Sequence, residues 1–147
     1  MNFNLKGEKM IPKIPSDVVF CVFGLLDAGT RVRASKPEIM AFFYAMSKKE
    51  RFKKIFKDFI FDTRDYSPYC EQVDSALSNL HACSMLSMID LKDYEVTSAL
   101  TRVHSLGLFN KKEKKLLKEV ALELEVGKND VKVYKPSWHK NYGGKGK

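Results

Sequence analysis

The residues best suited to metal chemistry are two cysteines and two histidines, Cys70, His81, Cys83 and His104. A zinc site needs such ligands to converge on one point. On a helix, Cys70 and His81 would lie about 16 Å apart, and His81 and Cys83, two residues apart, would point in different directions. The spacing therefore does not predict a metal site.

Signatures of catalysis and of phosphate binding are also absent from the sequence. A nucleophilic site needs a histidine held by a carboxylate, and no GxSxG pattern surrounds a serine in this chain. The patterns GxGxxG, GxxxxGK(S/T) and HExxH do not occur either. We therefore expect a protein that is not an enzyme, with no catalytic residues and no cofactor.

Basic residues recur at helical spacing in two stretches of the chain. One stretch contains Lys48, Arg51, Lys54 and Lys57, and the other contains Lys112, Lys115 and Lys118. Lysine and arginine neutralise phosphates and dominate affinity for nucleic acid, so both stretches are candidate binding faces. The neighbouring aromatic residues have the spacing of core positions rather than of exposed stacking platforms, which favours solvated helix faces.

The charge is distributed unevenly along the 147 residues. The formal net charge is +8, and 44% of the residues are hydrophobic, which is enough to form the core of one domain. Residues 61–100 contain seven acidic and two basic side chains, whereas residues 101–147 contain five acidic and twelve basic ones. A basic net charge ordinarily indicates an acidic partner, but the middle of this chain is acidic.

We expect a soluble, cytoplasmic protein without membrane contact. The longest apolar run, residues 18–26, contains Gly24 and is far shorter than the roughly 20 residues that span a membrane. The first ten residues are charged and no apolar signal region follows them. The three cysteines are an odd number without CxxC spacing, as expected of thiols in a reducing compartment.

The N-terminal part predicts an arm followed by a buried helix. Residues 1–15 contain two prolines and no periodic spacing of apolar residues, which is typical of an arm outside the domain. Ser16 and Asp17 predict the N-terminus of a helix over residues 18–28, and Gly29 would end it. Because this helix is apolar on nearly all sides, we expect it in the centre of the fold.

Two further helix starts follow, each with the Ser-x-x-Glu pattern of a capping box. The start at Ser35 predicts a helix to about Met46, and the start at Ser47 predicts a helix over residues 51–61. The second helix would carry the basic residues from Lys48 to Lys57 on one face. Its other face would contribute four core residues, Phe52, Ile55, Phe56 and Phe59.

The stretch over residues 62–86 is expected to organise the rest of the fold. A loop from Tyr66 to Tyr69 precedes a helix over residues 72–86, with Ser67 as its N-cap. The apolar face of this helix would be Val73, Ala76, Leu77, Leu80 and Ser84. We expect a ring of Tyr66 or Tyr69 to pack on the core, and both tyrosines are candidate partner-binding residues together with Lys48, Arg51, Lys54 and Lys57.

A hairpin and a closing helix complete the predicted domain. Residues 88–91 and 94–96 predict a β-hairpin, and the alternative is a loop leading into a helix that ends near Ser105. Asn110 predicts the start of a helix over residues 111–126, which Gly127 would end. A last strand is expected near Val133. Residues 135–147 form a basic tail, in which Trp138 is expected to dock on the domain.

The order of these elements resembles the Panacea antitoxin domain family. The resemblance lies in the loop Tyr66-Ser67-Pro68-Tyr69, the helix sequence VDSALSNL, the stretch Tyr94-Glu95-Val96-Thr97, and the start of the closing helix at Leu108–Glu113. It covers about residues 16–126, but Ser67 replaces the family's usual glycine before the proline. It implies a winged-helix-like fold and a protein that neutralises a partner by binding it, in a bacterial or prophage setting.

We therefore predict one mainly α-helical domain over residues 16–134, with five or six helices and a small β-hairpin in a winged-helix-like arrangement. The predicted function is antitoxin-like binding of a protein partner. One alternative is a winged-helix nucleic-acid-binding regulator, although the helix that would enter the groove carries Glu71 and Asp74 and neither lysine nor arginine. The other alternative is a phage-encoded inhibitor of a host defence system.

Overall fold

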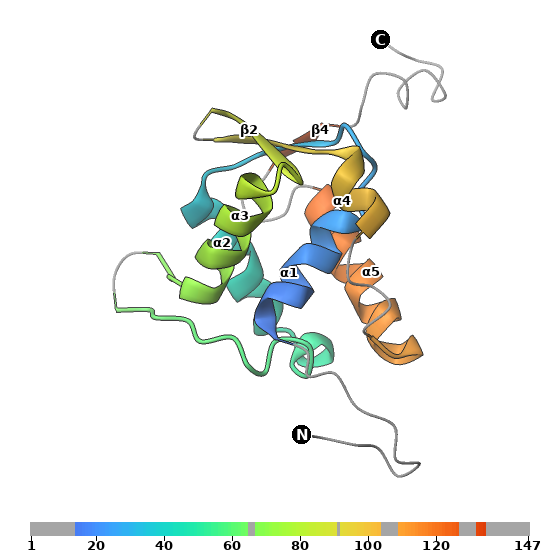
Figure 1. The fold of residues 1–147 in the computed structure, drawn as a ribbon. Helices are drawn as coiled ribbons and strands as arrows, with labels where there is room; N and C mark the ends of the chain where they lie inside the picture. Colours follow the sequence, from blue (N-terminus) through green and yellow to red (C-terminus); the bar gives the residue numbers. More distant parts are fainter. Residues whose placement is uncertain (1–13, 65–66, 91, 104–108, 127–131, 135–147) are drawn as a thin grey trace.

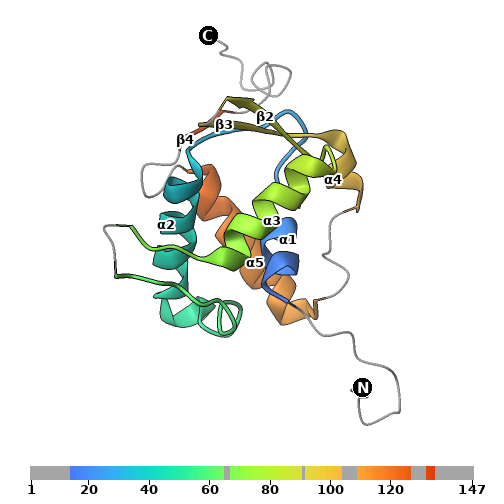
Figure 2. The ribbon, with the colours of Figure 1, turned by 60° about the vertical axis from the view of Figure 1, so that its left-hand side comes forward.

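The computed structural model describes residues 14–64, 67–90, 92–103, 109–126 and 132–134. The helices among them are α1 (Pro15–Gly24), α2 (Lys36–Ser47), the 3-10 helix η1 (Glu50–Phe52), α3 (Glu71–Ala82), α4 (Ser98–Val103) and α5 (Lys111–Glu125). The strands are β1 (Arg31–Arg33), β2 (Leu86–Asp90), β3 (Asp93–Val96) and β4 (Lys132–Tyr134). The sheet lies across one end of the helices, and the chain between η1 and α3 runs along the opposite end (Figures 1 and 2).

The described residues form an α+β fold rather than the mainly α-helical one predicted. The predicted hairpin is confirmed, because β2 and β3 pair antiparallel with Met88 opposite Tyr94. It belongs to a four-stranded sheet of order β2-β3-β1-β4, in which every neighbouring pair is antiparallel. The alternative of a loop in place of the hairpin is wrong, but a helix does follow, since α4 begins at Ser98.

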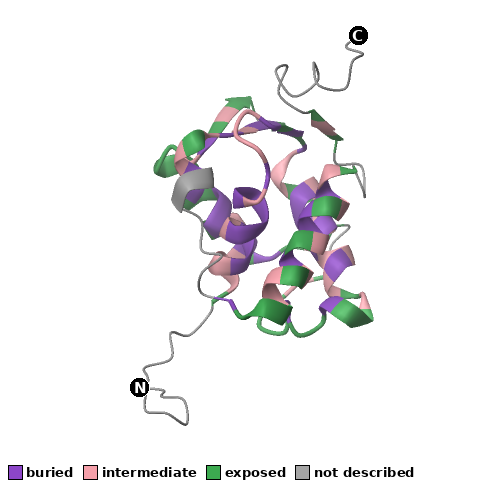
Figure 3. Cartoon of the chain, turned by 90° about the vertical axis from the view of Figure 1, so that its right-hand side faces the viewer, coloured by how far each residue is buried: buried purple, intermediate pink, exposed green. Residues whose placement is uncertain are grey.

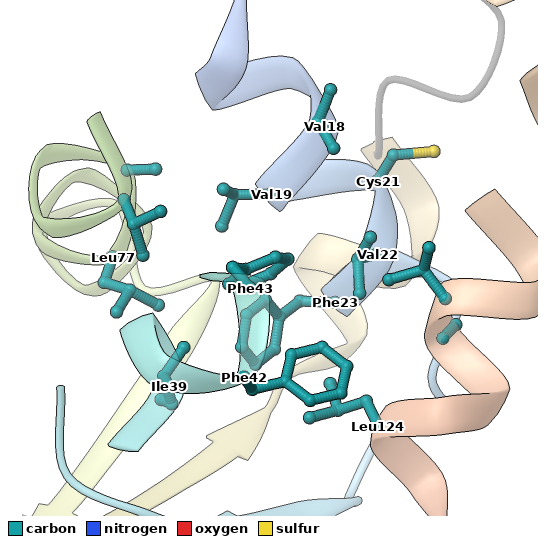
Figure 4. Packing of buried hydrophobic residues seen from close by; sticks show 14 of the residues in the cluster. Val18, Val19, Cys21, Val22, Phe23, Ile39, Phe42, Phe43, Leu77 and Leu124 are labelled. Carbon is teal, nitrogen blue, oxygen red and sulfur yellow. The ribbon is translucent and has the colours of Figure 1, made fainter. Parts of the chain in front are cut away.

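Helix α1 occupies the centre of the fold, as its apolar sequence predicts. It contacts α3, α4 and α5. Val19, Val22 and Phe23 are completely buried, and they point into the space between α2, α3 and α5 (Figure 4). Buried residues lie where the elements face one another, and exposed residues lie on their outer sides (Figure 3).

The ends of α1 differ from the prediction. The helix starts at Pro15, whose fixed φ suits the first helical position, and the Asp17 carboxylate accepts a hydrogen bond from the Ile14 N–H at 3.1 Å. Asp17 therefore lies within the first turn instead of preceding the helix. The helix ends at Gly24, before a turn in which Gly29 has a φ of 91° and donates its N–H to the Val96 carbonyl at 2.7 Å.

Two helix starts are confirmed at the level of individual hydrogen bonds. Ser35 and Glu38 form a capping box at α2, where the Ser35 N–H donates to the Glu38 carboxylate at 2.8 Å. Asn110 and Glu113 form the equivalent pair at α5, with hydrogen bonds of 2.9 and 2.8 Å. Both helices lie within one residue of their predicted bounds, because capping is decided by residues close together in sequence.

The predicted helix over residues 51–61 is wrong. In this segment only the 3-10 helix η1 is helical, and turns follow it as far as Asp58. The four predicted core residues are nevertheless buried. The rings of Phe59 and Phe61 stack with centroids 6.1 Å apart, and Phe61 also meets Tyr44 of α2 at 5.3 Å. Residues two apart on an α-helix point in different directions, so this aromatic packing requires a non-helical backbone.

Helix α3 starts within one residue of its predicted bound, but its N-cap differs from the prediction and it ends four residues earlier than predicted. Asp62 and Tyr69 exchange two backbone hydrogen bonds of 2.7 and 2.8 Å, and Cys70 rather than Ser67 precedes the helix as its N-cap. At the other end, Ser84 adopts a φ of 61° and is exposed, so it does not extend the apolar face. The other four residues predicted for that face are buried.

Several predictions fall on parts of the chain that the structure does not describe. They concern the arm before Ile14, Tyr66, Gly127, Val131, and the tail after Tyr134 with Trp138. Among the described helices, none has the length and apolar character needed to cross a membrane.

Candidate partner-binding groove around Tyr69

Tyr69 presents an aromatic ring at the surface in a fixed orientation. Its side chain lies just before α3, and the residue is 47% exposed. The Tyr69 hydroxyl donates to the Asp74 carboxylate at 3.1 Å, and the Lys36 ammonium donates to the same carboxylate at 2.8 Å. Lys36 also donates to the Ser78 hydroxyl at 2.9 Å. The polar tip of the ring is therefore anchored while much of the residue remains accessible.

The charges in this network favour the hydrogen bonds at neutral pH. The hydrogen bond from Lys36 is the main cause that lowers the pKa of the Asp74 carboxyl group, although partial burial opposes it. The hydrogen bond to Asp74 is the main cause that raises the pKa of the Tyr69 phenol. The ionised carboxylate and the protonated phenol are thus the forms that the contacts stabilise.

A hollow of about 570 Å³ opens beside the Tyr69 ring. Its lining residues are Ile14, Pro15, Ser16, Ile60, Asp62, Tyr69, Glu71, Gln72 and Ser75. Ile14 is 54% exposed and Ile60 is 74% exposed. Together with Tyr69 they are three large apolar side chains that face solvent around one hollow. The charged lining residues, Asp62 and Glu71, are both acidic. A hydrogen bond from Arg64 lowers the pKa of Asp62 to about 2, which keeps this carboxylate ionised.

Gln72 holds the wall of this hollow in place. Its side-chain oxygen accepts the Ile60 N–H at 2.8 Å, and its side-chain nitrogen donates to the Asp58 carbonyl at 3.0 Å. The Cys70 thiol also donates to the Gln72 oxygen at 3.3 Å, and burial raises the pKa of this thiol. Helix α3 thereby fixes the extended segment that carries Ile60.

Two smaller hollows adjoin the first one. A hollow of about 440 Å³ shares Tyr69 with it and is also lined by Lys36, Pro37, Met40, Ser67, Pro68 and Asp74. A hollow of about 160 Å³ shares Ile14 and Pro15 with it and includes Lys54 and Lys57 in its lining. We refer to the three hollows together as the Tyr69 groove.

The four predicted basic residues do not share a helix face, which corrects the sequence-based prediction. Arg51 pairs with Glu119 and Glu123 of α5, each at 3.3 Å. Lys48 lies over the Tyr44 ring, with its ammonium 4.9 Å from the ring centre. These two side chains therefore contact the protein itself, Lys48 at the end of α2 and Arg51 from η1 across to α5.

Lys54 and Lys57 are the two predicted basic residues that reach the groove. Tyr69 also lies there, whereas Tyr66 is outside the described residues. Ile14, Ile60 and Gln72 were not predicted as site residues from the sequence. An isoleucine in the sequence predicts burial, and only the path of the chain shows that these two are exposed.

The candidate metal ligands are not brought together. Cys70 is buried before α3, whereas His81 and Cys83 are exposed near the other end of that helix. His104 lies outside the described residues. In the described ranges, no group of three cysteine, histidine or acidic side chains is arranged to hold a metal ion.

Comparisons with protein-family models, with curated proteins and with solved structures find no match to this chain.

Proposed function

We propose that this chain is a non-enzymatic interaction protein that binds a protein partner through the Tyr69 groove. The observation that carries the proposal is the meeting of three exposed apolar side chains, Ile14, Ile60 and Tyr69, around one hollow of about 570 Å³. Exposed apolar clusters of this kind are typical of sites where proteins bind one another. An aromatic ring with a fixed orientation is a frequent anchor at the centre of such a contact.

The charge of the hollow indicates the chemistry of the partner. Asp62 and Glu71 are its charged lining residues. Asp62 already pairs with Arg64 at 2.7 Å, whereas Glu71 is exposed. A partner that inserts an aliphatic or aromatic side chain and places lysine or arginine beside Glu71 would match both the apolar residues and the acidic side of this hollow. Opposite charges at a rim mainly speed association, whereas the buried apolar centre mainly sets the lifetime of the complex.

The proposal includes an antitoxin-like role in which binding neutralises a toxin. Its support is the resemblance of the Tyr66–Tyr69 loop and the following helix to the Panacea antitoxin domain, since Tyr69 belongs to this loop and lines the groove. The same proposal includes a winged-helix-like fold, in which the hairpin β2–β3 is the wing. The setting would be bacterial or prophage.

The test is co-expression with the product of the neighbouring gene as the candidate toxin. The wild-type chain should restore growth and form a complex in size-exclusion chromatography. Ile60→Asp and Tyr69→Asp should both abolish rescue while the circular dichroism spectrum stays unchanged. Leu122→Asp on α5 is the matched control, because Leu122 is 59% exposed and does not line the groove. Full rescue by the Ile60→Asp and Tyr69→Asp variants would contradict the proposal.

A further inference from the structure

The outward face of the sheet forms a second surface, separate from the Tyr69 groove. In β1, Val32 is completely buried and Arg31 and Arg33 are exposed on either side of it. In β4, Lys132 and Tyr134 are exposed and alternate with the partly buried Val133. Successive side chains of a strand point to opposite faces, so the exposed residues of both strands lie on one face.

The register places an aromatic ring and a lysine beside the two arginines. Arg31 is directly opposite Tyr134, and Arg33 is directly opposite Lys132. Like charges in directly opposed positions are destabilising. The pairing of Arg33 with Lys132 is therefore unfavourable by itself, and an anion between them would offset it.

Asp93, on the neighbouring strand β3, fixes the side chains of both arginines. Its side chain is only 2% exposed, and it accepts hydrogen bonds from Arg31 and from Arg33, the latter at 3.1 Å. The two arginine side chains remain 44% and 52% exposed. A guanidinium has five N–H donors, so each arginine retains donors that can face a ligand.

Two hollows on this face meet at Arg33. One, of about 270 Å³, is lined by Arg31, Arg33, Asp93 and Tyr134. The other, of about 290 Å³, is lined by Arg33, Glu38, Lys92 and Lys132. Within the described chain, the ammonium groups of Lys92 and Lys132 form no ion pair. One Glu38 oxygen is already occupied by the capping box of α2.

The opposite half of the face is acidic. Glu95 of β3 lies directly opposite Arg31, and Asp90 ends the neighbouring strand β2. The basic area is thus confined to β1, β4 and Lys92. It suits a ligand with one phosphate and one flat ring better than a long polyanion that crosses all four strands.

From these contacts we infer that this basic area binds a nucleoside phosphate unit, either as a free nucleotide or within single-stranded nucleic acid. The base stacks on the Tyr134 ring, and the phosphate lies between Arg33, Lys92 and Lys132. Aromatic stacking together with lysine and arginine contacts is the common mode of single-strand recognition. Asp93 takes part as a positioning residue, because its nearly buried carboxylate orients both arginines.

The experiment is fluorescence anisotropy of the full chain with fluorescein-labelled ten-nucleotide oligo(A) RNA and oligo(dT) DNA, with AMP, adenosine and inorganic phosphate as competitors. Lys92→Glu with Lys132→Glu should weaken oligonucleotide binding at least about tenfold, and Tyr134→Ser should also weaken it about tenfold, whereas Tyr134→Phe should retain it. The matched control is Lys115→Glu with Lys118→Glu on α5, which changes the net charge equally and should alter affinity less than about twofold. Circular dichroism verifies that each variant is folded.

The competitors distinguish the source of the nucleotide. AMP that competes as well as the oligonucleotide supports a free nucleotide, and an oligonucleotide that binds far more tightly than AMP supports a single strand. Inorganic phosphate that competes as well as AMP, together with an unchanged affinity of Tyr134→Ser, would overturn the inference. An equal loss in the α5 control, or the absence of binding by every probe, would overturn it as well.

Discussion

Gln72 of α3 holds Ile60 at the surface, since the Ile60 N–H donates to the Gln72 side-chain oxygen at 2.8 Å. The same side chain donates to the Asp58 carbonyl at 3.0 Å. One polar residue on a helix thus fixes an extended segment whose isoleucine is 74% exposed. The apolar part of the Tyr69 groove depends on this contact.

Replacement of Gln72 by alanine should therefore lower both stability and partner affinity. Its two hydrogen bonds to the backbone are lost, together with the weak one from the Cys70 thiol. Each of the two backbone bonds contributes about 0.5–1.5 kcal/mol, so we expect a decrease of about 1–3 kcal/mol in the free energy of unfolding. Urea denaturation measures this change. Asn79→Ala, at an exposed position of the same helix, serves as the control and should cost less than about 0.5 kcal/mol. Equal stability of the two variants would show that Gln72 does not brace the segment.

The ion pair between Lys36 and Asp74 should give a contribution to stability that acid removes. The pKa of Asp74 in the folded protein lies below its ordinary value of 3.8, mainly because of the Lys36 hydrogen bond. The contribution is therefore present above about pH 4 and is lost as the pH falls through the folded pKa. Because the pair is about one-third exposed, we expect less than about 1 kcal/mol at pH 7.

Urea titrations of wild type and Asp74→Asn at several pH values check this dependence. The wild type should be more stable at pH 7, and the difference should shrink between pH 4 and pH 2. A difference that grows as the pH falls would contradict the assigned ion pair.

Tyr69→Ala should reduce partner binding far more than stability. A fully buried ring costs about 3–5 kcal/mol when truncated, but Tyr69 is about half exposed. We expect a loss of about 1 kcal/mol in the free energy of unfolding, measured by thermal denaturation, and loss of rescue in the co-expression experiment. A loss above about 3 kcal/mol in the free energy of unfolding would show instead that the Tyr69 ring belongs to the core. That outcome would agree with the sequence-based prediction that a tyrosine of this loop packs on the core.

Phe43→Ala should be strongly destabilising. Phe43 of α2 is fully buried and its ring lies within 6.5 Å of the rings of Phe23, Phe42, Phe56 and Phe59, measured between ring centres. Truncation leaves a cavity among these rings, so we expect a loss of about 3–5 kcal/mol in urea denaturation. Phe43→Leu fills part of the cavity and should cost clearly less. Similar losses of unfolding free energy for Phe43→Ala and Phe43→Leu would contradict this prediction, because they would show that the neighbouring rings move in to fill the cavity.

Some elements were predictable because a few neighbouring residues decide them. The capping boxes at Ser35 and Asn110 specify α2 and α5 through hydrogen bonds across three residues, and the periodic apolar residues of α3 specify its buried face. The hairpin β2–β3 was predictable for the same reason, because a short turn joins two strands that are adjacent in sequence.

Only the tertiary structure decided the elements that depend on distant partners. Strand β1 contains two arginines around one valine, a sequence with little strand character, and it forms because β3 and β4 pair with its two edges. The segment after η1 has a helical pattern, but its phenylalanines pack on α2 and on one another in a way that an α-helix does not allow.

The candidate sites belong to the same class of long-range features. Ile14 is far from Ile60 and Tyr69 in the sequence, and Arg33 and Lys132 belong to strands that are distant in the sequence. The sequence by itself determined the residue types that can make these contacts, together with the local helix starts that capping specifies. Which residues meet, and which apolar side chains remain exposed, was decided by packing between distant segments, because burial depends on the complete arrangement of the chain rather than on neighbours in sequence.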